Sequence, residues 1–152
     1  LSTLHTNDAP STVTRLLNMG VEPFLVTASL NLVLAQRLAR KICVECRTEI
    51  KAEPQALLDV GYRKEDLPNV RTFKGVGCPK CNGSGYKGRI ALYEVMPMSE
   101  ELREAVLAGA TGSELKRAAA QGGMKTLRQS GLTKCAEGMT TLEEILRVTM
   151  AD

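Results

Sequence analysis

The sequence predicts an α/β protein with an inserted zinc-binding subdomain and a C-terminal helical region. Two Cys-x-x-Cys motifs, Cys43–Cys46 and Cys78–Cys81, bracket residues 47–77. Apolar residues alternate along residues 30–38, and from Pro97 onward they recur at helical spacing. We therefore expect three parts. These are an α/β core part over residues 1–41, a four-cysteine zinc-binding subdomain over 42–88, and a return strand followed by helices over 89–152.

The first part is expected to end a strand and begin a helix. Leu1–Leu4 alternates apolar and polar residues, which is typical of the end of a strand. Asp8 can cap a helix that has Pro10 in its first turn and ends at Gly20. His5 would then lie between strand and helix, where α/β folds bind anionic ligands. The alternative is that His5 has only a structural role beside the cap.

A second helix, two strands and the insert between the cysteine pairs are expected next. A second helix runs from Glu22 to about Leu30, and alternating apolar residues predict a strand from Leu32 to Lys41. Residues 47–77 form an insert that contains a short helix. Arg89 to Val95 is expected to be a strand that returns to the main body. Glu94 interrupts its apolar pattern, and we interpret this residue as either solvated or paired with a nearby arginine.

A series of helices is expected after Pro97 because apolar residues recur there at helical spacing. Gly109 closes the first helix, and a capping box at Thr111–Glu114 opens the second. A third helix is expected over residues 124–136. A further capping box, Thr140–Glu143, opens the last helix. Its inward residues are predicted to be Leu142, Ile145 and Leu146.

The paired cysteines predict a structural zinc site. Cys43, Cys46, Cys78 and Cys81 can present their thiolates from two tight turns, which gives a closed tetrahedral site. A redox Cys-x-x-Cys needs a strand-to-helix turn, and disulfides suit secreted chains, so both alternatives fit less well. Cys135 has no partner motif and is expected to be a packed apolar residue. The basic residues that could offset the negative charge of the zinc site are Lys41, Arg47, Lys80, Lys87 and Arg89.

Composition weighs against several other functions. A net charge of +3 and only 3% aromatic residues are unfavourable for binding nucleic acid. The longest apolar stretch, residues 24–35, contains polar residues and is too short to span a bilayer. The chain begins at Leu1 rather than Met, and its first residues are typical of a strand end. We therefore expect a fragment of a longer protein.

Several segments together resemble the motor ATPases of type II secretion and type IV pilus assembly, the PilB/GspE family. Residues 85–89 and 123–128 are more similar to the pilus-extension member than to the type II secretion member. The segments that carry the family resemblance are residues 1–10, 19–25 and 34–40, the four-cysteine element, and residues 138–149.

The resemblance implies the C-terminal part of a RecA-like ATPase domain from a homo-hexameric motor, at the cytoplasmic face of the inner membrane. Such a motor hydrolyses ATP with Mg²⁺ and drives an inner-membrane platform protein to add pilin or pseudopilin subunits. By the same resemblance His5, with Thr3 and Thr6 beside it, would lie at the γ-phosphate. The arginines that the resemblance places near the nucleotide are Arg89, Arg15 and Arg37.

The sequence departs from a complete ATPase in two respects. It contains no Gly-x-x-x-x-Gly-Lys-Ser/Thr phosphate loop, and the Walker B element is missing as well. We therefore expect ATP hydrolysis to belong to the parent protein and not to this chain alone.

A zinc-dependent interaction module is the alternative function. Residues 78–85 fit Cys-x-x-Cys-x-Gly-x-Gly, the repeat of the DnaJ-type chaperone zinc domain, whereas no glycines follow Cys46. A zinc ribbon that binds nucleic acid is a further alternative, and the mild charge and scarce aromatic residues weigh against it.

Overall fold

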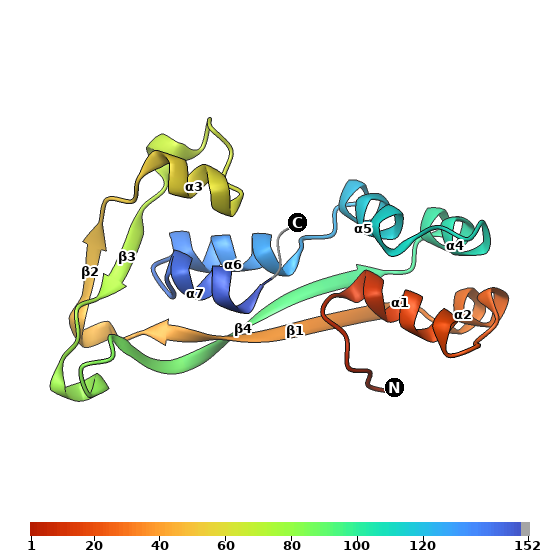
Figure 1. Ribbon diagram of the computed structural model, residues 1–152, viewed down its shortest axis with the longest axis horizontal. Helices are drawn as coiled ribbons and strands as arrows, with labels where there is room; N and C mark the ends of the chain where they lie inside the picture. The colour runs from red at the N-terminus through yellow and green to blue at the C-terminus, as the bar shows by residue number, and fades with distance from the viewer. Residues whose placement is uncertain (150–152) are drawn as a thin grey trace. The chain divides into compact units, whose positions relative to one another are not determined.

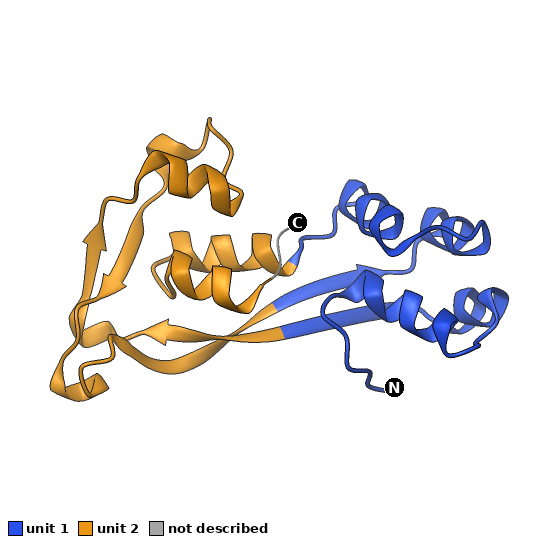
Figure 2. Ribbon diagram, in the orientation of Figure 1, with its two compact units in different colours: residues 1–36, 93–126 blue, residues 37–92, 127–152 orange. Residues whose placement is uncertain are grey.

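The computed structural model describes residues 1–149 and has the mixed α/β character that the sequence predicts (Figure 1). The chain forms two compact units, coloured separately in Figure 2. Unit 1 contains residues 1–36 and 93–126, and unit 2 contains residues 37–92 and those from 127 onward. Among the described helices, none combines the length and hydrophobicity that a membrane span requires.

Helices form most of unit 1. They are α1 (Ala9–Asn18), α2 (Pro23–Ser29), α4 (Glu100–Leu107) and α5 (Gly112–Gln121). Helix α1 contacts α2 and α5, and α4 contacts α2 and α5. The helices share an apolar core with residues of the adjoining strands. Its buried members are Ala9, Val13, Val26, Val33, Met96, Met98, Leu102, Val106, Leu115, Ala119 and Met124.

The predicted caps of unit 1 are confirmed. Asp8 is the N-cap of α1, and its Oδ1 accepts a hydrogen bond from the backbone N–H of Ser11 at 2.8 Å. At the start of α5, Thr111 and Glu114 form the reciprocal capping box. These contacts satisfy N–H groups that a helix cannot pair internally, which explains why the polar residues precede each apolar run.

The longest strands are β1 (Leu32–Ile42) and β4 (Tyr86–Pro97), which form a two-stranded sheet. The alternation that predicts β1 is therefore confirmed. Its leucines, however, lie on the exposed face: Leu32, Leu34 and Leu38 are 50%, 53% and 51% exposed. A period of two indicates a strand whichever face is covered.

Glu94 lies on the buried face of β4. The alternate residues Leu92, Glu94 and Met96 have exposed fractions of 0%, 1% and 1%. The interpretation of Glu94 as a solvated residue is wrong, because a strand places alternate side chains on one face and its apolar neighbours turn that face inward.

In unit 2 the insert folds as a small hairpin topped by a helix. Strand β2 (Arg47–Ile50) pairs antiparallel with β3 (Thr72–Gly75). Between them lie α3 (Pro54–Val60) and the 3₁₀ turn η2 (Leu67–Asn69). Leu57 and Val60 of α3 are buried. The predicted short helix is confirmed. The sequence analysis did not predict the two strands.

The C-terminal helices of unit 2 are α6 (Leu127–Ala136) and α7 (Leu142–Val148), which pack against each other. The N-cap of α7 is Thr141 rather than Thr140, since the Thr141 hydroxyl accepts from Glu144 N–H. Leu146 is 49% exposed, so its predicted inward position is wrong. Glu144 takes the buried place beside Ile145, where arginines neutralise its charge.

Leu1–Leu4 is not a strand in the structure. A strand needs a hydrogen-bonded neighbour, and within residues 1–149 the sheets pair β1 with β4 and β2 with β3. The predicted strand end is therefore wrong as a description of this chain.

Candidate metal centre and the His5 segment

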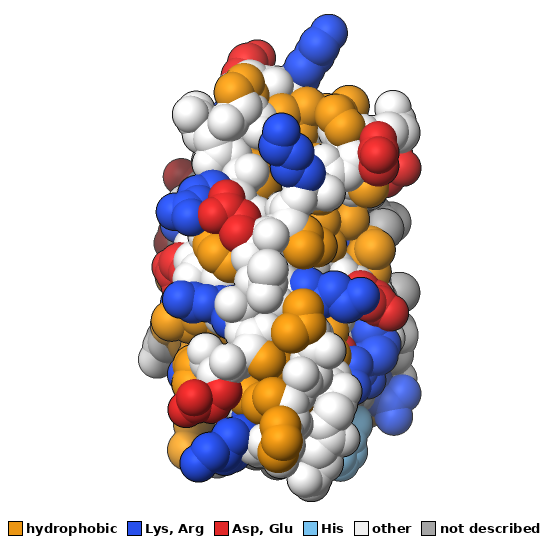
Figure 3. Space-filling model, turned by 90° about the vertical axis from the view of Figure 1, so that its left-hand side faces the viewer, with side chains coloured by type: hydrophobic (Ala, Val, Ile, Leu, Met, Phe, Trp, Pro, Cys, Tyr) orange, Lys and Arg blue, Asp and Glu red, His pale blue; other side chains and the backbone are white. Residues whose placement is uncertain are grey.

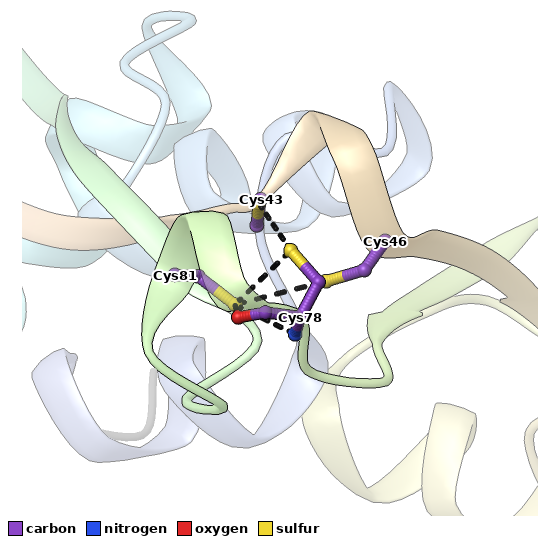
Figure 4. A group of neighbouring side chains, drawn as sticks. All are labelled: Cys43, Cys46, Cys78 and Cys81. Carbon is purple, nitrogen blue, oxygen red and sulfur yellow. Dashed lines mark hydrogen bonds between the residues drawn. The ribbon is translucent and has the colours of Figure 1, made fainter.

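Two short 3₁₀ turns bring the four cysteines together. The turn η1 (Val44–Cys46) follows β1, and η3 (Pro79–Cys81) stands between β3 and β4. The four sulfur atoms, from Cys43, Cys46, Cys78 and Cys81, lie within 4.8 Å of one another. Figure 4 shows the side chains converging on one point.

The spacing of the sulfur atoms fits a tetrahedral zinc ion. Sγ of Cys43 lies 3.8 Å from Sγ of Cys78, and Sγ of Cys46 lies 3.9 Å from Sγ of Cys81. Four thiolates at a Zn–S distance of ~2.3 Å stand about 3.8 Å apart at the corners of a tetrahedron. These separations exclude a disulfide, in which the sulfur atoms are about 2.05 Å apart. The predicted set of ligands therefore fits the metal.

Backbone N–H groups prepare one of these sulfurs for the thiolate state. The N–H groups of Cys78 and Gly85 donate to Sγ of Cys81 at 3.2 and 3.3 Å. Burial tends to raise the pKa of Cys81, but these hydrogen bonds oppose it and the pKa falls to about 6. Burial raises the pKa of Cys46 to about 12 when no metal is bound. A metal ion would stabilise both thiolates, because its positive charge replaces the protons.

Glycine is required where β3 passes the second knuckle, the turn around Cys78–Cys81. A Cβ atom on Gly75 would lie 2.0 Å from the carbonyl oxygen of Gly85. Gly85 has a φ of +75°, in the left-handed region that glycine tolerates best. Only a pair of glycines lets the two backbones approach this closely.

The basic residues around the centre are mostly exposed, and both signs of charge are interspersed on the face shown in Figure 3. Arg47 has a defined structural contact. Its Nη1 donates to the carbonyl oxygen of Gly138 at 3.3 Å, and its guanidinium lies 5.3 Å from the centre of the Phe73 ring. Arg47 thus ties the hairpin to the end of α6.

Cys135 does not belong to the sulfur cluster. Its side chain is 1% exposed, and its Sγ donates to the carbonyl oxygen of Thr140 at 3.3 Å. Burial raises the pKa of the Cys135 thiol to about 12. The prediction of a packed apolar residue is confirmed.

The His5 segment lies in unit 1, directly before α1. His5 and Thr3 are exposed, and Thr6 is half-buried. The Thr6 and Thr12 hydroxyl oxygens are 2.8 Å apart, which ties the segment to the first turn of α1. The N–H of Ala9 donates to Oε1 of Glu94 at 2.7 Å. The cap and these contacts hold the backbone of the segment and leave the His5 ring at the surface.

The arginines expected near a nucleotide are distributed over both units. Arg15 lies in the last turn of α1 in unit 1 and is exposed. Arg37 is half-buried on β1, and Arg89 is exposed on β4, both in unit 2. The roles of His5, Thr3, Thr6 and these arginines stay predictions.

A buried carboxylate in unit 2 escaped the sequence analysis. Glu144 is fully buried and accepts hydrogen bonds from the N–H and the guanidinium of Arg40, at 2.8 to 3.0 Å. Arg147 donates to both of its oxygens. The Arg40 guanidinium also lies 4.2 Å from the centre of the Tyr86 ring. The pattern of a capping box also fits Thr141-x-x-Glu144, one residue after the predicted box at Thr140–Glu143. This spacing is the signal that could have found Glu144.

The arginines set the charge state of Glu144. Hydrogen bonds from Arg147, and further ones from Arg40, outweigh the burial that tends to raise its pKa. They lower the pKa of Glu144 to about 2. Glu144 is therefore a permanent anion at neutral pH, and it joins β1 to α7.

Fold and site together define an α/β protein with a four-cysteine cluster that could hold a metal ion at the base of a hairpin insert. The chain belongs to the Type II/IV secretion system protein family, whose sequence profile matches residues 1–147. The resemblance to the PilB/GspE family is thereby confirmed.

Curated relatives of the family come from both kinds of machine. The chain is 54% identical, over 100% of its length, to the type IV pilus assembly ATPase PilB of Myxococcus xanthus. It is 47% identical to the protein of the same name from Thermus thermophilus, over 99% of its length. It is 46% identical to the type II secretion system protein HxcR of Pseudomonas aeruginosa, over 98% of its length. The chain spans only 27%, 17% and 28% of these relatives.

Proposed function

We propose that this chain is the C-terminal part of a hexameric motor ATPase that powers type IV pilus assembly. The observation that carries the proposal is the 54% identity, over the whole chain, to a relative named as a pilus assembly ATPase. Assembly of a type II secretion pseudopilus is the second candidate, favoured by the 46% identity to HxcR. In either case the motor would be cytoplasmic, peripheral at the inner membrane, and would act on an inner-membrane platform protein rather than on nucleic acid.

Zinc would have a structural role in this motor. Four thiolates fill a tetrahedral zinc site, so no position stays open for water or substrate. The metal would join the end of β1 to the start of β4 and hold both ends of the hairpin insert. The functional parts of the chain would be the α/β core part over residues 1–41, the zinc-binding subdomain over 42–88, and the return strand with its helices over 89–152.

His5 would serve the ATPase site of the parent protein, which would bind ATP and Mg²⁺ through a phosphate loop outside this chain. An exposed imidazole can donate to a γ-phosphate oxygen or orient the attacking water, and a protonated ring adds positive charge. The Thr3 and Thr6 hydroxyls would assist on either side. Arg89, Arg15 and Arg37 would neutralise phosphate charge.

The test is His5→Ala in the full-length hexamer. If His5 serves hydrolysis, kcat falls by roughly 10²-fold, the scale for removing one transition-state donor. Zinc content and nucleotide affinity then stay close to those of the wild type. If His5 is only structural, the melting temperature falls while the folded enzyme turns over normally. Near-wild-type ATPase activity per folded hexamer would contradict the proposed role.

Two further measurements test the chain alone and the choice between the two candidates. In a calorimetric titration, the 152-residue chain should bind ATP only weakly, since it lacks the phosphate loop. Binding at micromolar concentrations would contradict this expectation. The full-length gene should restore pili to a strain that lacks its pilus assembly ATPase. Restoration of type II secretion in a strain that lacks its type II secretion ATPase, without restoration of pili, would favour the second candidate.

A further inference from the structure

The start of α1 is held by a carboxylate from a distant part of the chain. The backbone N–H of Ala9 donates to Oε1 of Glu94 at 2.7 Å, in a buried hydrogen bond. The exposed fractions of Ala9 and Glu94 are 0% and 1%. Ala9 is the first residue of α1, and its N–H has no acceptor inside the helix. Glu94 therefore supplies an acceptor that the helix itself cannot provide.

This contact is more than a helix cap. Asp8 already caps α1 through Ser11, which is the local device that begins most helices. Glu94 adds a link to β4, across 85 positions of sequence. Burying a carboxylate is costly unless it is hydrogen-bonded, and the positive end of a helix favours a negative charge. The hydrogen bond to the start of α1 offsets this cost, and it fixes the position where α1 begins.

The exposed position of His5 makes this link consequential. Core packing does not hold its ring, so the ring's location depends on the backbone that leads into α1. That backbone is tied down at Thr6, at Asp8 and at Ala9. The bond from Ala9 reaches another element of the fold, strand β4, whereas the bonds of Thr6 to Thr12 and of Asp8 to Ser11 stay within the first turn of α1.

We infer that Glu94 is a positioning residue for His5. By binding the first N–H of α1, it fixes the His5 segment against β4 and places the imidazole for its work on the nucleotide. This inference rests on the proposed function, in which His5 serves ATP hydrolysis. Glu94 itself does not touch the reacting atoms.

Loss of the Glu94 acceptor should lower turnover and leave nucleotide affinity unchanged. A displacement of about 1 Å in a positioned group costs up to ~10²-fold in rate. We expect Glu94→Met, which keeps the side-chain length but has no acceptor oxygen, to lower kcat by at least ~10-fold. Glu94→Gln keeps an oxygen for the Ala9 N–H and should stay within a few fold of the wild type.

The experiment is a double-mutant cycle in the full-length hexamer. Glu94→Met, His5→Ala and the double variant are compared for kcat, KM and the melting temperature. If Glu94 acts through His5, Glu94→Met lowers kcat in the wild type and has no further effect in the His5→Ala variant. An equal loss in both backgrounds, or no rescue by Glu94→Gln, would overturn the inference.

The same variants separate this inference from the proposed function. Normal turnover in His5→Ala would refute the role of His5. A slow His5→Ala enzyme beside a fully active Glu94→Met enzyme would refute only the positioning role. Glu144→Gln is the matched control. It also removes a buried carboxylate, but one that lies in unit 2, whereas Glu94 and His5 lie in unit 1. It should lower stability and leave kcat per folded hexamer unchanged.

Hydrogen exchange gives a test that does not depend on a folded variant. In the wild-type hexamer, the Ala9 amide should exchange slowly, because its N–H is bonded and buried. Exchange as fast as at an uncapped helix start would overturn the inference, even if Glu94→Met fails to fold.

Discussion

Glu144→Gln tests whether a buried ion cluster stabilises unit 2. The carboxylate of Glu144 is fully buried and joins Arg40 of β1 to Arg147 of α7. Glutamine has nearly the same shape but carries no charge, and its amide NH₂ would face guanidinium donors. The substitution therefore removes the charge-assisted hydrogen bonds while leaving the packing nearly intact.

The pKa of Glu144 gives the size of the effect. Its pKa is about 2 in the folded chain, against an ordinary value of 4.5. At 1.36 kcal/mol per pKa unit, the folded state favours the carboxylate by about 3 kcal/mol. The side chains of Arg40 and Arg147 are 47% and 57% exposed, so solvent screening reduces this figure. We expect Glu144→Gln to lower the free energy of unfolding by about 2 kcal/mol at pH 7.

The dependence on pH follows from the sign of the shift. Because folding lowers this pKa, the stabilisation is complete above the unfolded value of 4.5 and is lost as the pH falls towards about 2. Urea unfolding of both proteins, with zinc, measures the difference at each pH. That difference should be constant near neutrality and shrink in acid. A difference below ~0.5 kcal/mol at pH 7, or one that grows in acid, would refute this reasoning.

The remaining predictions concern the metal and two glycines with close neighbours. Cys78→Ser should remove most of the zinc found by metal analysis, whereas Cys135→Ser should retain it; full retention in the Cys78 variant would refute the ligand assignment. Gly75→Ala places a methyl group 2.0 Å from a backbone oxygen of the second knuckle, so zinc affinity should fall by ~10-fold, and unchanged affinity would contradict the close approach. Gly131→Ala brings a methyl group within 2.7 Å of Ile145, and such overpacking costs ~1–3 kcal/mol, which would be visible as a lower melting temperature.

Local signals in the sequence predict most elements of this fold. Asp8 and the box at Thr111 begin helices where expected, because capping depends on residues within one turn. Alternation predicts β1 but not which face is covered, since that depends on helices from elsewhere in the chain. Strands β2 and β3 are four residues each, and their pairing across the insert is a long-range feature that no local pattern encodes.

The candidate site divides in the same way. The cysteine ligands follow from spacing, because each pair lies within one turn. The partners of Glu94 and Glu144 do not follow from local sequence, since a charged residue is typical of an exposed position unless its partner is known. The spacing Thr141-x-x-Glu144 indicates a residue at a helix start, but it does not show which arginines the carboxylate contacts. Those partners, the Ala9 N–H and the Arg40 guanidinium, stand 85 and 104 positions away. Only the folded chain brings them together.

The insert is attached to the rest of unit 2 both at its base and near its tip. At its base are the cysteines, and near its tip the Tyr62 hydroxyl donates to the carbonyl oxygen of Leu132 on α6 at 2.8 Å. Covalent chain, metal and helix thus close a ring, and thermodynamic linkage makes any coupling around a ring reciprocal. Zinc would then bind more tightly when α6 is in place, and α6 would be more firmly held when zinc is bound. A metal that never meets the substrate could in this way influence the C-terminal helices.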